Sequence, residues 1–146
     1  MIKRILVCTD GSECAKRAAL TAAEIASRFT AEVILINVSN PAPAMGPYLM
    51  AAEAIPDISG IQQALLEAQQ AIIEGARADL ESSGIEPRVR VETGQPVFEV
   101  VRVAEEENAD LIVLGSRGMG GFQRLLMGSV SDGVLHHAHC PVLIVR

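Results

Sequence analysis

The stretch ADLIVLGSRGMGGFQRLLMGSVSD, residues 109–132, joins a dense apolar run directly to a segment rich in glycine. Five of the positions from Gly115 to Asp132 are glycines. A short apolar run bounded by turn residues is typical of a buried strand, and Ser129 stands where a helix would begin. The stretch therefore predicts a strand, a glycine loop and a helix in succession.

Along the rest of the chain, short apolar runs alternate with segments whose apolar residues recur at the spacing of a helix. Residues 3–9, 32–38, 87–93, 110–115 and 141–146 are expected to form strands. Helices are expected after Ser12, from about 59–60 to Gly84, from about Pro96, and over roughly 129–139. Five strands that alternate with four helices predict an α/β domain with a mostly parallel sheet.

Two segments depart from this pattern. Residues 39–60 contain four of the seven prolines and are expected to form a loop or lid, long enough to suggest a functional role. Residues 87–93 alternate charged residues with valine, which indicates a strand that is solvated on one face and lies near an edge of the sheet.

Length and composition limit the class of protein. The 146 residues fit a single domain, 1–146. The net charge is −6 and no cluster of Lys and Arg is present, which argues against nucleic-acid binding. No apolar run is long enough to span a membrane, and the N-terminal residues lack the features of a signal peptide, so a cytoplasmic location is expected. The three cysteines, an odd number without framework spacing, are expected to be reduced.

The glycine stretch has the properties of an anion site. Its spacing is Gly115, Gly118, nine further residues and then Gly128-Ser129, which is not a P-loop and contains no lysine. A helix that begins here leaves unpaired N–H groups and the positive end of its dipole to face an anion. Arg117 and Arg124 are candidates to face phosphate oxygens. A flexible loop that only joins strand to helix is the alternative, and spacing alone does not separate the two.

Three other groups of residues have competing interpretations. Asp10 follows the first strand and shares a crevice with Gly115 if the first and fourth strands are neighbours, but an Asp-Gly pair can also simply close a turn. Ser129 can serve as a helix N-cap as well as a phosphate ligand. The histidines of HHAH, residues 136–139, lack partners at metal-like spacing, and no metal site is expected there.

Several motifs together resemble the ATP-binding subgroup of the universal stress protein family. That pattern reads G-x-x-G, nine residues, then G-[ST], and it is matched here from Gly115 to Ser129. VCTDGS after the first strand, GQP before the third helix, ADLIVLGSRG and GSVSDGVLHHAHCPVLIV extend the match over nearly the whole chain, apart from the proline-rich segment. The resemblance implies a Rossmann-like open sandwich, with a five-stranded parallel sheet flanked by four helices, that binds ATP as a homodimer through its C-terminal strand.

The resemblance also implies roles for individual residues. Thr9 and Asp10 belong to the turn near the ribose, or near a phosphate-bound Mg²⁺ that Asp10 would contact. The main chain of Val38 contacts the edge of the adenine base. The ribose side and the phosphate cradle are formed by Leu114, Gly115, Arg117, Gly118, Gly128, Ser129 and Val130. Asn37 stands where the family often has histidine. This difference is given little weight, because the implied contact with adenine is made by main-chain atoms.

The leading hypothesis is a regulatory stress-response module that binds ATP and hydrolyses it weakly at most. A phosphoryl-transfer enzyme or ATPase using the same site is the main alternative, and the absence of a loop lysine and of an evident general base argues against it. A flavin protein is disfavoured because the chain has one Tyr and no Trp. A family member that binds no nucleotide is disfavoured by the complete glycine set.

Overall fold

The computed structural model describes residues 1–41, 58–118 and 127–146. The elements in chain order are β1 (Arg4–Cys8), α1 (Glu13–Phe29), β2 (Glu32–Ser39), α3 (Ile58–Ser82), β3 (Arg88–Thr93), α4 (Pro96–Glu106), β4 (Leu111–Gly115), α5 (Ser129–His137) and β5 (Val142–Val145). Most of the proline-rich segment and the arch after Gly118, with Arg124, lie outside the described residues.

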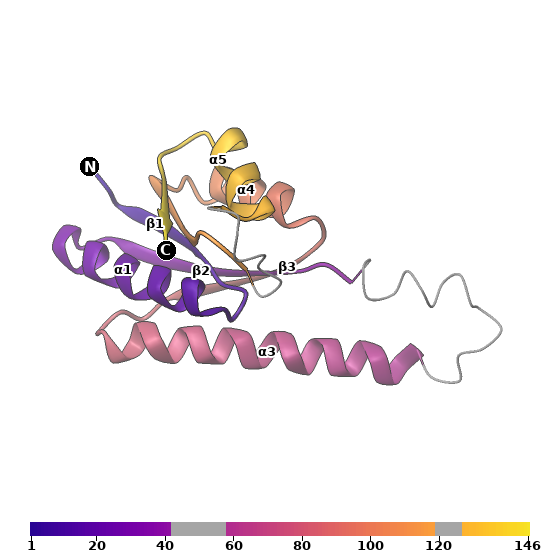
Figure 1. Cartoon of the computed structure of the whole chain (residues 1–146). Coiled ribbons are helices and arrows are strands. Elements are labelled where there is room, and N and C mark those ends of the chain that lie inside the picture. Colours follow the sequence, from indigo (N-terminus) through magenta and orange to yellow (C-terminus); the bar gives the residue numbers. More distant parts are fainter. Residues whose placement is uncertain (42–57, 119–126) are drawn as a thin grey trace.

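The five strands form one parallel sheet in the order β3-β2-β1-β4-β5. Helices α1 and α3 cover one face and α4 and α5 cover the other (Figure 1). The chain moves from β1 outward to β3 and then returns to β4 on the other side of β1. The connections therefore reverse direction between β1 and β4, and in such sheets that reversal opens a crevice at the carboxyl ends of the strands. The Rossmann-like fold predicted from the sequence is confirmed.

The three central strands explain why the sheet is stable in this order. Every residue from Ile5 to Val7, from Val33 to Ile36 and from Leu111 to Leu114 is buried, because helices cover both faces of these strands. Alternate side chains from each strand enter separate apolar clusters on the two faces. Alanines on the buried face of α1 are small enough to bring that helix close to the sheet: Ala15, Ala18, Ala19, Ala22, Ala23 and Ala26.

The ends of the helices follow the local signals in the sequence. The Ser12 hydroxyl accepts a hydrogen bond from the Ala15 N–H and caps α1, as predicted. Pro96 occupies the first turn of α4, whose cap is the side chain of Gln95. Gly84 lies just beyond α3 with φ +79°, a conformation that favours glycine. Helix α3 begins at Ile58, slightly before the expected start.

The two edges of the sheet differ in character. β3 lies at one edge, as its alternating pattern predicted, and its Arg88 and Arg90 make ion pairs with glutamates of β2, β3 and α4. β5 forms the other edge, and its four apolar residues are all half-buried. No helix within the described residues is long and apolar enough to cross a membrane.

Candidate functional site

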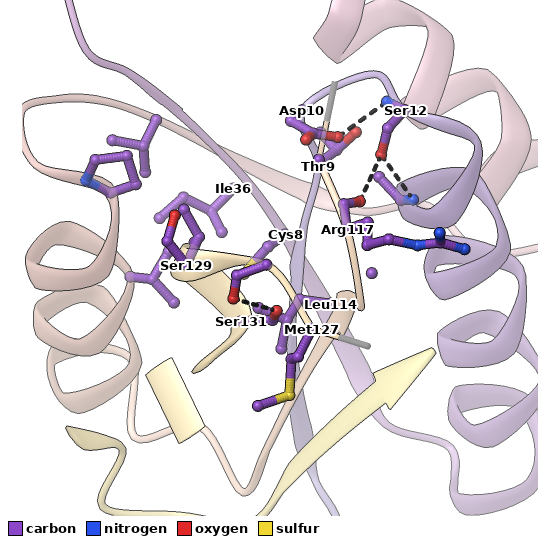
Figure 2. A pocket seen from close by; sticks show the side chains of 18 residues that line it. Cys8, Thr9, Asp10, Ser12, Ile36, Leu114, Arg117, Met127, Ser129 and Ser131 are labelled. Carbon is purple, nitrogen blue, oxygen red and sulfur yellow. Dashed lines mark hydrogen bonds between the residues drawn. The ribbon is translucent and has the colours of Figure 1, made fainter. Parts of the chain in front are cut away.

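A pocket of about 400 Å³ opens at the carboxyl ends of β1 and β4, where the connections of the sheet reverse (Figure 2). This volume lies within the range of about 300–1,000 Å³ that is usual for small-molecule sites. Asp10 and Ser12 lie on one side of the pocket, and Ser129 and Ser131 on the other. The lining residues come from β1, α1, β2, α4, β4, α5 and the segments next to them: Cys8, Thr9, Asp10, Ser12, Ala15, Ile36, Val38, Pro96, Val100, Leu114, Gly115, Arg117, Gly118, Met127, Gly128, Ser129, Val130 and Ser131.

One wall of the pocket is apolar. It combines Ile36 and Val38 at the end of β2 with Pro96 and Val100 of α4 and with Leu114 of β4. Ile36, Val100 and Leu114 are each at most 3% exposed, so their packing against the sheet fixes the shape of this wall. Such a surface suits the face of a flat, weakly polar ring better than a charged group.

The turn after β1 holds Asp10 in a fixed position. The Asp10 Oδ1 atom accepts a hydrogen bond from the Ser12 N–H at 2.9 Å, and Gly11 between them has φ +82°. The turn is also tied to β2, because the buried Asn37 side chain donates to the Thr9 carbonyl at 2.8 Å. Asp10 thus closes an Asx turn, and its other oxygen, Oδ2, points along the pocket toward Gly118.

At two positions of the loop, neighbouring protein atoms leave no room for a Cβ atom, so glycine is required. A Cβ on Gly115 would lie 2.8 Å from the Cys14 main chain, at the start of α1. A Cβ on Gly118 would lie 2.6 Å from the Asp10 Oδ2 atom. Both glycines are therefore required by packing within the protein: Gly115 lets α1 pack on β4, and Gly118 leaves room for the Asp10 carboxylate.

Helix α5 begins without a side-chain cap. Its N-cap is Gly128 and makes no side-chain cap hydrogen bond, so the prediction that Ser129 is the N-cap is wrong by one residue. The Gly128 N–H donates to the Ser116 carbonyl at 2.6 Å, and it is therefore already satisfied by protein. The first N–H groups of any helix lack intrahelical partners, and Ser129 and Val130, which carry two of these groups, both line the pocket. This exposed, positive end of the dipole is suited to an anion.

Comparison with known proteins agrees with this geometry. The sequence model of the universal stress protein family matches the whole chain, residues 1–146. The chain belongs to the universal stress protein family. Universal stress protein MJ0531 of Methanocaldococcus jannaschii is 37% identical over 146 residues, which cover 100% of this chain and 83% of that relative.

Solved structures show the same fold. Hypothetical protein MJ0577 superposes with a TM-score of 0.81 at 30% identity, covering 99% of this chain and 96% of that one. A universal stress protein crystallised in complex with cAMP superposes with a TM-score of 0.71 at 28% identity, covering 99% and 97% of the two chains.

In this universal stress protein the fold brings together ten residues predicted for the site from the sequence, while the further candidate Arg124 lies outside the described residues. Thr9, Asp10, Val38, Leu114, Gly115, Arg117, Gly118, Gly128, Ser129 and Val130 all line the pocket. Arg117 differs from expectation in its direction: its side chain extends toward α1, on the opposite side of the pocket from Ser129 (Figure 2). Its guanidinium therefore does not face the start of α5 in this conformation.

The histidines near the C-terminus are separate from the pocket. His136 and His137 each place Nδ1 at 2.8 Å from a main-chain carbonyl one turn earlier, and both are exposed. Within the described part of the chain, no three His, Cys, Asp or Glu side chains gather as a metal-binding group.

Several residues of the site were missed by sequence reasoning. Ile36, Pro96 and Val100 belong to the apolar wall, and the sequence marks them only as apolar residues of a predicted strand and helix. Asn37 was set aside, although its side chain anchors the turn that carries Asp10. Cys8 also lines the pocket, where burial first and the Asp10 carboxylate second raise the pKa of its thiol to about 12.

Proposed function

We propose that this universal stress protein binds ATP in the pocket between β1 and β4 and acts as a nucleotide-dependent regulatory module. The observation that carries the proposal is the uncapped start of α5, which opens into a cavity with an apolar wall on its other side. The related universal stress protein crystallised with cAMP supports an adenine nucleotide as the ligand.

The parts of the pocket correspond to the parts of a nucleotide. The apolar wall would hold the base, with the main chain of Val38 at its edge. Asp10 and the end of β4 at Leu114 and Gly115 would flank the ribose. The phosphates would lie over the start of α5, where the N–H groups of Ser129 and Val130 are available. Each contact with a helix start contributes about 0.3–1 kcal/mol and micromolar binding needs about 8 kcal/mol, so base and phosphate contacts are both required.

A Mg²⁺ ion would accompany the phosphates. Mg²⁺ is usually held by one or two carboxylates together with substrate phosphates and water. Asp10 can offer Oδ2, since Oδ1 is occupied by the Ser12 N–H. The residues therefore fit an ion that arrives with the nucleotide, and Asp10 would be its protein ligand.

The proposed activity is binding, with hydrolysis that is slow at most. Phosphoryl transfer to water needs a group that positions the nucleophile. Asp10 is the only carboxylate among the described residues that line the pocket, and the Asx turn already uses one of its oxygens. A nucleotide held without rapid turnover suits a protein whose bound state is sensed by a partner.

The proposed assembly is a homodimer through β5. Charged side chains at the β3 edge resist pairing with another strand, and Arg88 and Arg90 of β3 lie within a network of ion pairs. The apolar β5 edge lacks this protection, and the sequence Val142–Val145 contains no charged residue. A second copy of β5 is the natural partner.

Isothermal titration of the purified protein with ATP, with and without Mg²⁺, tests the proposal. We expect saturable binding of one nucleotide per chain in the micromolar range. Phosphate release measured over hours separates a binding module from an enzyme. Failure of ATP to bind at millimolar concentration refutes the proposed function, and sustained turnover at enzyme-like rates of about 1 per second or more refutes the regulatory assignment.

A further inference from the structure

We propose that Ser131 is a positioning residue for the phosphate-binding end of α5. Its hydroxyl fastens the first turn of the helix to the end of β4 and so fixes the direction of the N–H groups that receive phosphate. The inference rests on the proposed function, and it concerns a residue that the sequence motif does not contain.

The evidence begins with the hydrogen bonds of Ser131. Its Oγ lies 3.0 Å from the Ser116 carbonyl and 3.0 Å from the Gly128 carbonyl. Ser131 is 2% exposed and Ser116 1% exposed, so water does not compete for these bonds. A hydroxyl carries one proton, which Ser131 donates to one of these carbonyls at a time or shares between them.

These bonds join two segments that are distant in sequence. Ser116 directly follows β4, and its carbonyl also accepts the Gly128 N–H at 2.6 Å. Two donors from the start of α5 therefore meet on one carbonyl group. The Ser116 N–H donates in turn to the Val145 carbonyl in β5 at 2.7 Å. The peptide units on both sides of Ser116 thus connect the start of α5 firmly to the sheet.

The consequence for a ligand follows from the directionality of hydrogen bonds. An N–H group binds an oxygen well over a narrow range of distance and angle. Ser129 and Val130 lie between Gly128 and Ser131, so the two anchors enclose two residues that line the pocket and whose N–H groups have no intrahelical partner. Without the Ser131 hydroxyl, the Gly128 N–H would make the one hydrogen bond among the described residues that joins this turn to Ser116, and the two N–H groups would be held less firmly.

The chemistry of the position supports a neutral donor. A helix often has Glu or Gln at this third position, where the side chain returns to cap the helix start. A carboxylate there would lie beside the phosphates and repel them. Serine instead donates its proton to the Ser116 or the Gly128 carbonyl and brings no negative charge to the helix start.

The test compares Ser131→Ala with Ser27→Ala as a matched control. The exposed Ser27 hydroxyl donates to the Ala23 carbonyl at 2.9 Å within α1, so this variant also removes a bond from a serine hydroxyl to a main-chain carbonyl, away from the pocket lining. ATP binding is measured by calorimetry, and adenosine binding by ligand-observed NMR, which detects weak complexes. Both variants remove a single oxygen atom, and their folding is checked by circular dichroism.

We expect Ser131→Ala to bind ATP about tenfold more weakly, because one buried hydrogen bond no longer orients the cradle. Its affinity for adenosine, which lacks phosphate, should stay within about twofold of wild type, and Ser27→Ala should bind both ligands normally. Equal ATP binding by Ser131→Ala and wild type overturns the inference, as does an equal loss of ATP and adenosine. If the wild type itself binds no ATP, the proposed function fails first and the inference fails with it.

Discussion

Replacing Ser129 with aspartate should make the protein more stable and its ATP complex weaker. Ser129 is the first residue of α5, is exposed, and follows an N-cap with no side-chain hydrogen bond. A carboxylate at this position interacts favourably with the helix dipole, by about 0.3–1 kcal/mol. For a chain of this size, that corresponds to a rise in Tm of about 1–4 °C without ligand.

The same carboxylate would stand beside the bound phosphates. Two unit charges about 5 Å apart repel by about 1–3 kcal/mol when the effective dielectric constant lies between roughly 80 and 20. The expected loss of ATP affinity is therefore about 5- to 150-fold. Stability and affinity thus change in opposite directions, which a general disturbance of the fold does not produce.

Calorimetric titration with ATP and thermal unfolding without ligand measure the two effects. Gln62→Glu is the matched control, because it changes the net charge by the same amount on an exposed part of α3. We expect this control to bind ATP as the wild type does. The reasoning is refuted if Ser129→Asp retains wild-type affinity, or if Gln62→Glu loses affinity to the same extent, since phosphate would then not lie over the start of α5.

Three further predictions concern other parts of the molecule. The Gln69 Nε2 atom is buried and has no hydrogen-bond partner among the described residues, so Gln69→Met should raise the free energy of unfolding in urea by about 1 kcal/mol; a loss of stability would contradict this. The raised pKa of Cys8, about 12, should slow its alkylation by iodoacetamide at pH 8 about a thousandfold relative to the unfolded chain, and peptide mass spectrometry showing equal rates would disprove it. The carbonyls of Pro141 and Val145 face β4, so the Ile144 N–H points to the free edge; Ile144→Pro should therefore sediment as a monomer and the wild type as a dimer, and a monomeric wild type at micromolar concentration would overturn the proposed assembly.

The fold was predictable because its signals are local. Short apolar runs mark the strands, Ser12 marks the start of α1, and Pro96 marks the first turn of α4. The position of β3 at an edge followed from its alternating charges. Each of these features depends on residues that are adjacent in the chain, so one sequence is sufficient to find them.

The sequence predicted part of the pocket lining but not its geometry. All of the motif residues line the pocket, yet the reasons for Gly115 and Gly118 lie in contacts with Cys14 and Asp10, which are distant in sequence. Such close approaches depend on how α1 packs against β4, and no spacing rule contains that information. The roles of Asn37 and Ser131 were missed for the same reason, since each acts through a hydrogen bond to a main-chain carbonyl of another segment.

A crystal structure of the protein grown with saturating ATP and Mg²⁺ tests the central claim most directly. The account predicts phosphate oxygens within about 3.2 Å of the main-chain nitrogens of Ser129 and Val130, with the base against the apolar wall. Phosphates bound elsewhere, or a start of α5 that no phosphate contacts while nucleotide is bound, would contradict it.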